Sequence, residues 1–193
     1  MAITSVKTGS SFTSLQKYDS LLGPNPANGN SATWLIQRIT ASGLSSNITF
    51  SSIPQTYTHL QLRVAAVSPG EINHLIQFNG DTSTNYSWHE LYGTGTAVAA
   101  GALASASSIK GGYNGGTLPA STVIDILDYA NTNKYKTTRG LAGSDNNTGS
   151  NNYILFRSGN WRSTSAITSI NISTTGIGGG FSQYSTFALY GVK

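Results

Sequence analysis

The sequence contains no cysteine, and this absence excludes several kinds of site at once. The chain can form no disulfide, no cysteine-ligated zinc site and no thiol nucleophile. Charge is scarce too: charged residues make up 9% of the chain, against about a quarter in a typical globular protein. No apolar run approaches the roughly 20 residues that a membrane-spanning helix needs. We therefore expect no membrane partner and, since the first residues lack an apolar core, no secretory signal.

A chain with so little charge could be disordered, but aromatic and β-branched residues recur from Trp34 to the C-terminus. Disordered segments are poor in such residues, and 193 residues are enough to bury a core. Ser, Thr, Asn and Gly take the place of the missing charges, and these residues suit strands and turns better than helix interiors. The composition therefore predicts one β-rich globular domain.

The basic residues are scattered along the chain, although the formal net charge is +4. Their densest group is Lys134, Lys136 and Arg139, with Tyr135 as its one aromatic residue. Nucleic-acid-binding modules usually gather basic residues on one face. We therefore expect no nucleic acid as a partner.

Residues 1–32 differ in pattern from the rest of the chain. The segment 11–22 can form one short amphipathic turn or helix, and a linker rich in Gly, Pro and Asn follows it. Such an arm either docks on its own domain or anchors the protein in a neighbouring subunit. We favour the anchor. Its candidate residues are Phe12, Leu15, Tyr18, Leu21 and Leu22.

Short strand-like segments separated by turn residues follow from residue 33 onward. We expect strands at 34–40, 47–51, 59–66, 72–78, 86–92, 122–129, 134–141, 153–157, 166–173 and 184–192. The cleanest alternation places Leu60, Leu62 and Val64 on one face of a strand. The small residues of 94–120 predict a long loop or weak edge strands. The very apolar segment 122–129 predicts a strand buried on both faces.

This series of strands, with no convincing helix after residue 32, predicts an all-β fold. Unequal loops and the absence of an internal repeat favour a two-sheet antiparallel sandwich, most simply a jelly roll, over a propeller or a solenoid. We therefore predict an N-terminal arm with a linker over residues 1–32 and a β-sandwich domain over residues 33–193.

No group of residues in the sequence has the pattern of a catalytic or metal site. His59, His74 and His89 are too widely spaced for a typical metal motif, so structural roles suit them better. Asp125 lies in an apolar segment and should pair with an arginine or cap backbone groups, while Asp128 should open the next turn. Since nucleophile elbows and phosphate loops are also absent, we expect no enzyme activity, no catalytic residue, no metal and no cofactor.

The most distinctive polar and aromatic cluster is Tyr86, Trp88, His89 and Tyr92. Alternation along a strand places His89 on one face. The opposite face then carries Tyr86, Trp88, Glu90 and Tyr92. Core packing is the interpretation we favour, because aromatic residues in strands usually pack inward. The alternative is a stacking platform for a sugar ring or an interface hot spot.

Several stretches of the chain, taken together, resemble a known group of proteins. They include Phe-Ser-Ser-Ile-Pro-Gln-Thr-Tyr-Thr-His-Leu (50–60), Phe-Asn-Gly-Asp (78–81) with Asn-Tyr-Ser-Trp-His (85–89), Val-Ile-Asp-Ile-Leu-Asp-Tyr-Ala-Asn-Thr-Asn-Lys-Tyr-Lys-Thr (123–137), Trp-Arg-Ser-Thr-Ser-Ala-Ile (161–167) and 181–193. Taken in order over about residues 47–193, they resemble small virion structural proteins of tailed bacteriophages, many from aquatic bacteria. The segment 11–22 also looks like the leader of such proteins.

The resemblance implies a capsid decoration protein, of the cement or head-fibre type, on the exterior of the phage head. Such a protein is assembled in the host cytoplasm, resides on the virion surface and contacts the major capsid protein or other virion proteins. Cyclic symmetry and threefold positions favour a homotrimer. The alternative is a tail-fibre or head-fibre adhesin that binds host surface polysaccharide, which solvent-facing tyrosine or tryptophan side chains would favour.

Overall fold

The structure, a computed structural model, describes residues 33–145 and 152–193, and every regular element among them is a β-strand. The strands are β1 (Thr33–Thr40), β2 (Asn47–Phe50), β3 (His59–Ala66), β4 (Ile72–Phe78), β5 (Tyr86–Gly93), β6 (Val98–Ala106), β7 (Ile109–Asn114), β8 (Ala120–Leu127), β9 (Lys136–Ser144), β10 (Tyr153–Trp161), β11 (Ile170–Thr175) and β12 (Thr186–Val192). Residues 35–193 form one compact unit, and the following account concerns that unit. The predicted arm lies outside the described residues.

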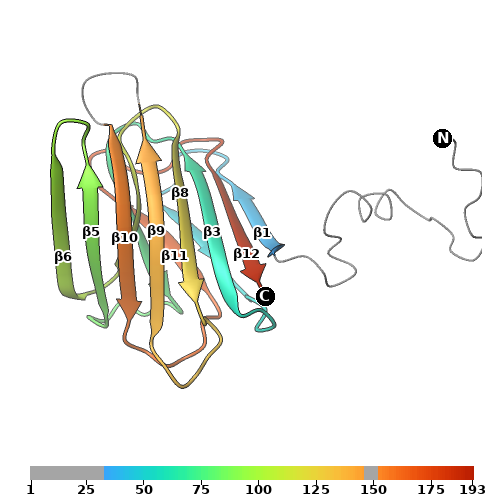
Figure 1. The fold of residues 1–193 in the computed structure, drawn as a ribbon. Helices are drawn as coiled ribbons and strands as arrows, with labels where there is room; N and C mark the ends of the chain where they lie inside the picture. The colour runs from blue at the N-terminus through green and yellow to red at the C-terminus, as the bar shows by residue number, and fades with distance from the viewer. Residues whose placement is uncertain (1–32, 146–151) are drawn as a thin grey trace, which may run out of the picture. The chain divides into compact units, whose positions relative to one another are not determined.

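The strands form a sandwich of two antiparallel sheets (Figure 1). The larger sheet has eight strands in the order β1-β12-β3-β8-β9-β10-β5-β6, and the smaller has four in the order β2-β11-β4-β7. We call the face of the larger sheet that packs on the smaller one its inner face, and the opposite face its outer face. The predicted all-β, two-sheet antiparallel sandwich is confirmed, while the jelly-roll topology stays a prediction.

Strand β3 follows the predicted alternation. Leu60, Leu62 and Val64 are buried on the inner face, and Arg63 on the outer face is exposed. The neighbouring strand β8 alternates in the same way, so the prediction that it is buried on both faces was wrong. Ile124 and Ile126 are buried, but Val123 between them is 40% exposed. The reason is that no layer of described residues covers the outer face at β8.

The main core lies between the two sheets and is built from these inner-face side chains. Aromatic side chains fill its ends: Tyr86 stacks on Trp161 with ring centroids 6.2 Å apart, and Phe181 meets Phe187 edge to face at 4.7 Å. The first pair joins segments far apart in the sequence, whereas the second closes a short stretch before β12. Burial of such large rings supplies most of the driving force for closing a sandwich.

The glycine- and alanine-rich region 94–120 contains two strands, β6 and β7, and each lies at the edge of a sheet. Of the two structures expected for this region, edge strands are therefore the correct one. Other predicted bounds were displaced: β9 extends to Ser144, β10 extends to Trp161, and β11 begins only at Ile170. Pattern reasoning fixes strand bounds poorly because strand ends depend on neighbouring strands.

A turn lies at Asn79-Gly80, and both residues have positive φ angles, 53° and 69°. This turn carries the chain from β4 in the smaller sheet to β5 in the larger one. Asp81 beyond it accepts a hydrogen bond of 2.7 Å from the indole Nε1 of Trp161. Hydrogen bonds from Ser83, above all, and from Trp161 lower the pKa of Asp81 to about 2. The charged Asp81 carboxylate thus links the turn between β4 and β5 to Trp161 in the core.

Candidate interaction surface

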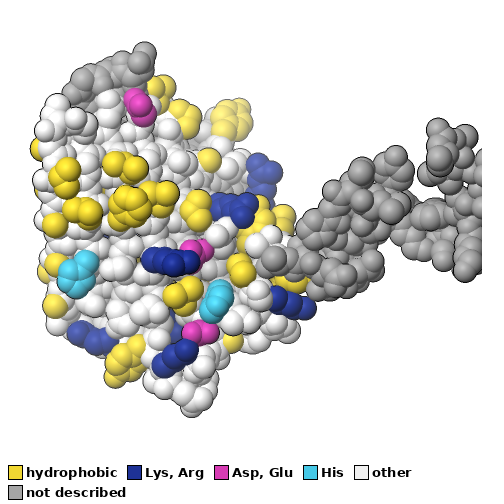
Figure 2. All heavy atoms as spheres, in the orientation of Figure 1, with side chains coloured by type: hydrophobic (Ala, Val, Ile, Leu, Met, Phe, Trp, Pro, Cys, Tyr) yellow, Lys and Arg dark blue, Asp and Glu magenta, His cyan; other side chains and the backbone are white. Residues whose placement is uncertain are grey.

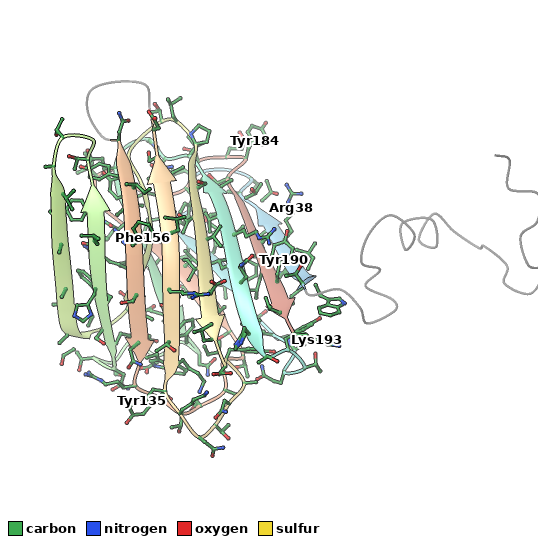
Figure 3. All side chains as sticks on the ribbon, viewed as in Figure 1. Arg38, Tyr135, Phe156, Tyr184, Tyr190 and Lys193 are labelled. Carbon is green, nitrogen blue, oxygen red and sulfur yellow. The ribbon has the colours of Figure 1, made fainter. Side chains whose placement is uncertain are left out.

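An apolar row crosses the outer face of the larger sheet. Its members are Leu91 on β5, Phe156 on β10, Leu141 on β9 and Val123 on β8, and each lies directly opposite the next in the strand register. Their exposed fractions are 50%, 56%, 47% and 40%. Figure 2 shows apolar side chains gathered over the middle of this face, and Figure 3 shows Phe156 on β10. Four neighbouring strands therefore present large apolar side chains to solvent at one level.

A polar row runs beside the apolar row, two residues further along each strand. Its members are His89, Ser158, Arg139, Asp125, Gln61 and Tyr190. The Arg139 Nε lies 3.2 Å from the Asp125 Oδ2, and the Gln61 amide donates to the Asp125 Oδ1 at 2.9 Å. The prediction that Asp125 pairs with an arginine is confirmed. These mutual bonds hold the polar side chains in a fixed arrangement next to the apolar row.

Arg63 extends this arrangement toward the β1 edge of the sheet. Its Nε donates to the Gln61 Oε1 at 2.7 Å, and its guanidinium carbon lies 4.5 Å from the ring centroid of Tyr190. A guanidinium over a tyrosine ring is attracted by the ring's negative face. The polar row therefore ends in an ordered cation and aromatic pair.

The apolar row and four members of the polar row (His89, Ser158, Arg139 and Asp125) line a shallow hollow of about 1060 Å³ on the outer face. Its walls combine apolar side chains with paired polar groups, the composition expected of a surface that binds another macromolecule. Scattered apolar residues on a protein surface need no explanation, but a contiguous patch marks an interaction site. We therefore regard the apolar row and the polar row together as the candidate interaction surface.

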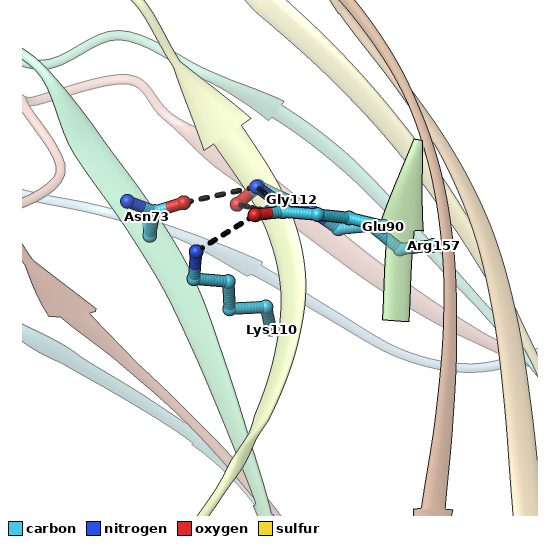
Figure 4. A network of polar contacts seen from close by, with 5 residues as sticks. All are labelled: Asn73, Glu90, Lys110, Gly112 and Arg157. Atoms are coloured by element: carbon cyan, nitrogen blue, oxygen red, sulfur yellow. Dashed lines mark hydrogen bonds and ion pairs between the residues drawn. The ribbon is translucent and has the colours of Figure 1, made fainter. Parts of the chain in front are cut away.

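A second polar group lies inside the sandwich, on the inner face of the same sheet (Figure 4). The Arg157 Nη2 lies 2.8 Å from the Glu90 Oε2, and the Lys110 Nζ lies 2.9 Å from the Glu90 Oε1. Arg157 also donates to the Asn73 Oδ1 at 3.0 Å and to the Gly112 carbonyl. Burial lowers the pKa of Arg157, and the Glu90 carboxylate opposes that shift. These groups satisfy one another and tie β5 and β10 to β4 and β7.

His74 lies beside this buried network and is itself fully buried. Its ring nitrogens, like the Thr122 hydroxyl, have no hydrogen-bond partner among the described residues. Burial, with a smaller effect of the Arg157 charge, lowers the pKa of His74 to about 3. The imidazole is therefore neutral at physiological pH. Gly112 is required here, because a Cβ at that position would lie 2.4 Å from the His74 Nδ1.

The predicted aromatic cluster is divided between the two faces of β5. Tyr86 is fully buried and its hydroxyl bonds the backbone of Phe78 and Asp81. Trp88 and Tyr92 point to the same inner face, and the Lys110 Nζ lies 4.2 Å from the Trp88 ring centroid. Only His89 lies on the outer face, where it is exposed. The predicted division of faces is confirmed, and the four side chains do not form one surface.

Phe12, Leu15, Tyr18, Leu21 and Leu22 fall outside the described residues. In the described part of the chain, no three or more His, Asp or Glu side chains gather as a metal ion would require. The basic group is dispersed: Lys136 is buried and donates to backbone carbonyls, while Lys134 pairs with Asp128.

The apolar row was missed by sequence reasoning. A signal for it was present, because Ile-Leu-Phe at 154–156 and Val-Ile at 123–124 place large apolar residues on both faces of their strands. We interpreted that signal at β8 as burial on both faces, whereas one face is open.

Among the described residues no helix is long and apolar enough to span a membrane. Comparison of the chain with protein-family models and with curated proteins found no match.

Proposed function

We propose that this chain is a structural protein of a bacteriophage particle, and specifically a capsid decoration protein on the exterior of the head. The resemblance of about residues 47–193 to virion structural proteins supports the phage assignment. The observation that carries the docking role is the apolar row, four large side chains in register on an exposed sheet face. Such a patch on a small protein is the mark of a protein–protein contact.

The role proposed for this protein is mechanical. Assembled in the host cytoplasm and carried on the virion surface, it bridges neighbouring subunits of the shell through its outer face. An interface of about 1,600 Å² gives stable association between proteins. Two shell subunits bridged in this way can separate only after that contact is broken. The apolar row supplies the desolvated centre of the contact, and the polar row supplies hydrogen bonds at its rim.

The adhesin alternative has less support in the described residues. A surface that stacks sugar rings needs solvent-facing aromatic side chains. Tyr86 is instead buried, and Trp88 points to the inner face. Phe156 remains as an exposed aromatic side chain within the candidate surface. Phe156 stands in a row of aliphatic side chains, and the other ring of the surface, Tyr190, has the Arg63 guanidinium over it; this arrangement suits a protein partner better than a polysaccharide.

The first experiment is to label the protein on intact virions with antibody and gold and to image the particles. We expect label over the head. Label confined to the tail would replace decoration by the adhesin role, and particles that carry no label at all would overturn the assignment to the virion.

The second experiment separates the two candidate docking elements on heads that lack the protein. The double variant Leu141→Ser, Phe156→Ser should bind such heads at least about tenfold more weakly, since each burial is worth more than 1 kcal/mol. Ile177→Ser is the matched control, because Ile177 is 90% exposed and is not in the row. Deletion of residues 2–30 tests the predicted anchor: undiminished binding would exclude it. Equal binding by wild type and the double variant would exclude the row.

A further inference from the structure

Every open sheet presents edge strands, whose backbone N–H and C=O groups can pair with another chain. Among the described residues the two sheets end in β1, β6, β2 and β7. Three of these edges carry a feature that opposes such pairing. β2 has only four residues, β7 is buried at all but one of its residues, and β1 carries the charged Arg38. Natural proteins use such features to prevent edge-to-edge association.

β6 has almost no such protection. It is nine residues long, reads Val-Ala-Ala-Gly-Ala-Leu-Ala-Ser-Ala, and contains neither a charged residue nor a proline. A β-bulge interrupts the pairing with β5 near Tyr86, where Ser105 has a φ of 52°, but the register from Val98 to Leu103 is regular. Val98 is 75% exposed and Leu103 is 50% exposed. A long, uncharged edge with exposed apolar side chains is the kind that associates with another strand.

We infer that β6 pairs with β6 of a second copy of this chain, antiparallel, about a twofold axis perpendicular to the sheet. A strand without charge can lie against itself with no repulsion between like charges, although the chain as a whole carries a formal net charge of +4. Its alanine and glycine side chains are small enough not to obstruct the approach of a second backbone. An isologous contact of this kind closes on itself and gives a dimer, in place of the homotrimer expected from the sequence.

The exposed side chains of β6 fit this arrangement. With the axis at Ala102, Leu103 lies opposite Gly101 of the second copy, so the smallest residue of the strand meets its largest. Leu103 points to the inner face, opposite Trp88 in β5, and would lose its exposure to water there. Directly paired residues in an antiparallel ladder point to the same face. Both outer faces therefore lie on one side of the dimer, and a doubled sheet presents two apolar rows to the same partner.

The test compares one substitution at two positions of the full-length protein. Ala102→Lys places two lysines against each other across the axis, and Ala65→Lys is the matched control on the outer face of the interior strand β3, where Ala65 is also exposed. We expect sedimentation velocity to show a dimer for wild type and for Ala65→Lys. For Ala102→Lys we expect a dimer dissociation constant raised at least about tenfold, which corresponds to roughly 1.4 kcal/mol.

A second measurement locates the contact. Because the chain has no cysteine, single variants Ala100→Cys, Ala102→Cys and Ala104→Cys can cross-link only between copies, and oxidised glutathione serves as the oxidant. With the axis at Ala102, the pair brings that residue directly against its own copy, with Cβ atoms about 4.5–5.5 Å apart, close to the roughly 4 Å that a disulfide spans. We expect Ala102→Cys to cross-link more efficiently than the other two, and Ala65→Cys not to cross-link.

Several outcomes would overturn the inference. These are a wild-type protein that stays monomeric at high concentration, a trimer that Ala102→Lys leaves intact, or an equal loss of association in both lysine variants. The inference does not depend on the virion role. A dimer that fails to bind phage heads would contradict the proposed function alone, and a monomer that binds them would contradict the β6 contact alone.

Discussion

Two ion pairs in the eight-stranded sheet have the same chemistry and opposite surroundings. Glu90 and Arg157 lie directly opposite each other on β5 and β10 and point inward, whereas Asp125 and Arg139 lie opposite each other on β8 and β9 and point outward. The side chain of Arg157 is 3% exposed and that of Arg139 is 73% exposed. The two pairs therefore measure what the sandwich interior does to one and the same interaction.

The two ion pairs differ in the cost of removing one partner and leaving the other charge alone. On the outer face, water solvates either charge when its partner is removed, so the pair contributes little to stability. On the inner face, a charge left without its partner has no water to replace it, and the cost is several kcal/mol. The buried pair thus makes the packing of β5 and β10 on β4 and β7 sensitive to a single residue. The outer pair, Asp125 and Arg139, is solvated, and a binding partner can displace that water.

The largest expected effect is that of Arg157→Ala. It leaves Glu90 buried with only Lys110 as a partner, and it removes the donors to Asn73 and to the Gly112 carbonyl. We expect the free energy of unfolding to fall by about 3–5 kcal/mol. Urea denaturation measures this directly.

A paired substitution is the control for that prediction. Glu90→Leu together with Arg157→Met removes both charges, and Lys110, whose side chain is 25% exposed, can then reach water. We expect this double variant to be more stable than Arg157→Ala, since apolar replacement of a buried pair is often nearly neutral. A loss in Arg157→Ala no greater than in an exposed pair would show that the interior is not dry.

The two histidines sharpen the comparison through pH. Burial lowers the pKa of His74 from 6.5 to about 3, so below pH 6.5 the unfolded chain takes up a proton that the folded chain refuses. Stability rises with pH wherever the unfolded state binds more protons, so it is lost here as the pH falls. We therefore expect a loss of up to about 1.4 kcal/mol per pH unit between about pH 6 and pH 4.5.

Denaturation of His74→Leu across the same range should lack this slope, because the titrating group is gone. His89→Gln, on the exposed outer face, should retain it. A slope that survived in His74→Leu would assign it to another group. Working above about pH 4.5 keeps Asp81, whose unfolded pKa is 3.8, out of the measurement.

The smallest expected effect is that of Arg139→Ala. The pair with Asp125 is exposed to solvent, and we expect the free energy of unfolding to change by about 0–1 kcal/mol. Thermal or urea unfolding beside Arg157→Ala provides the comparison under identical conditions. A loss as large as that of Arg157→Ala would mean that the outer face is covered in solution, for example by another protein chain.

Some elements could be predicted from the sequence because their cause is local. The alternation of Leu60, Leu62 and Val64 follows from the twofold period of a strand, and the turn at Asn79-Gly80 follows from the tolerance of these two residues for positive φ. The division of Trp88 and His89 between opposite faces has the same origin. Each of these features depends only on residues that are neighbours in the chain.

The candidate surface could not be predicted in that way. Its apolar row needs β5 beside β10 and β8 beside β9, and the strand order places β5 next to a strand that follows it by more than sixty residues. Val123 illustrates the limit: an apolar run predicts burial on both faces as readily as one exposed face. Only the sheet that packs on the other side, and the absence of described residues over this one, distinguish the two.

The sequence by itself determined that the chain is all-β, which residues alternate, where several turns fall, and that no cysteine chemistry is available. The tertiary structure decided that Arg157 is buried while Arg139 is exposed, that His74 is buried and neutral, and that the apolar row is exposed to solvent. The physical reason is that strand formation depends on the period of the chain, whereas burial depends on which strands and sheets come to lie against one another.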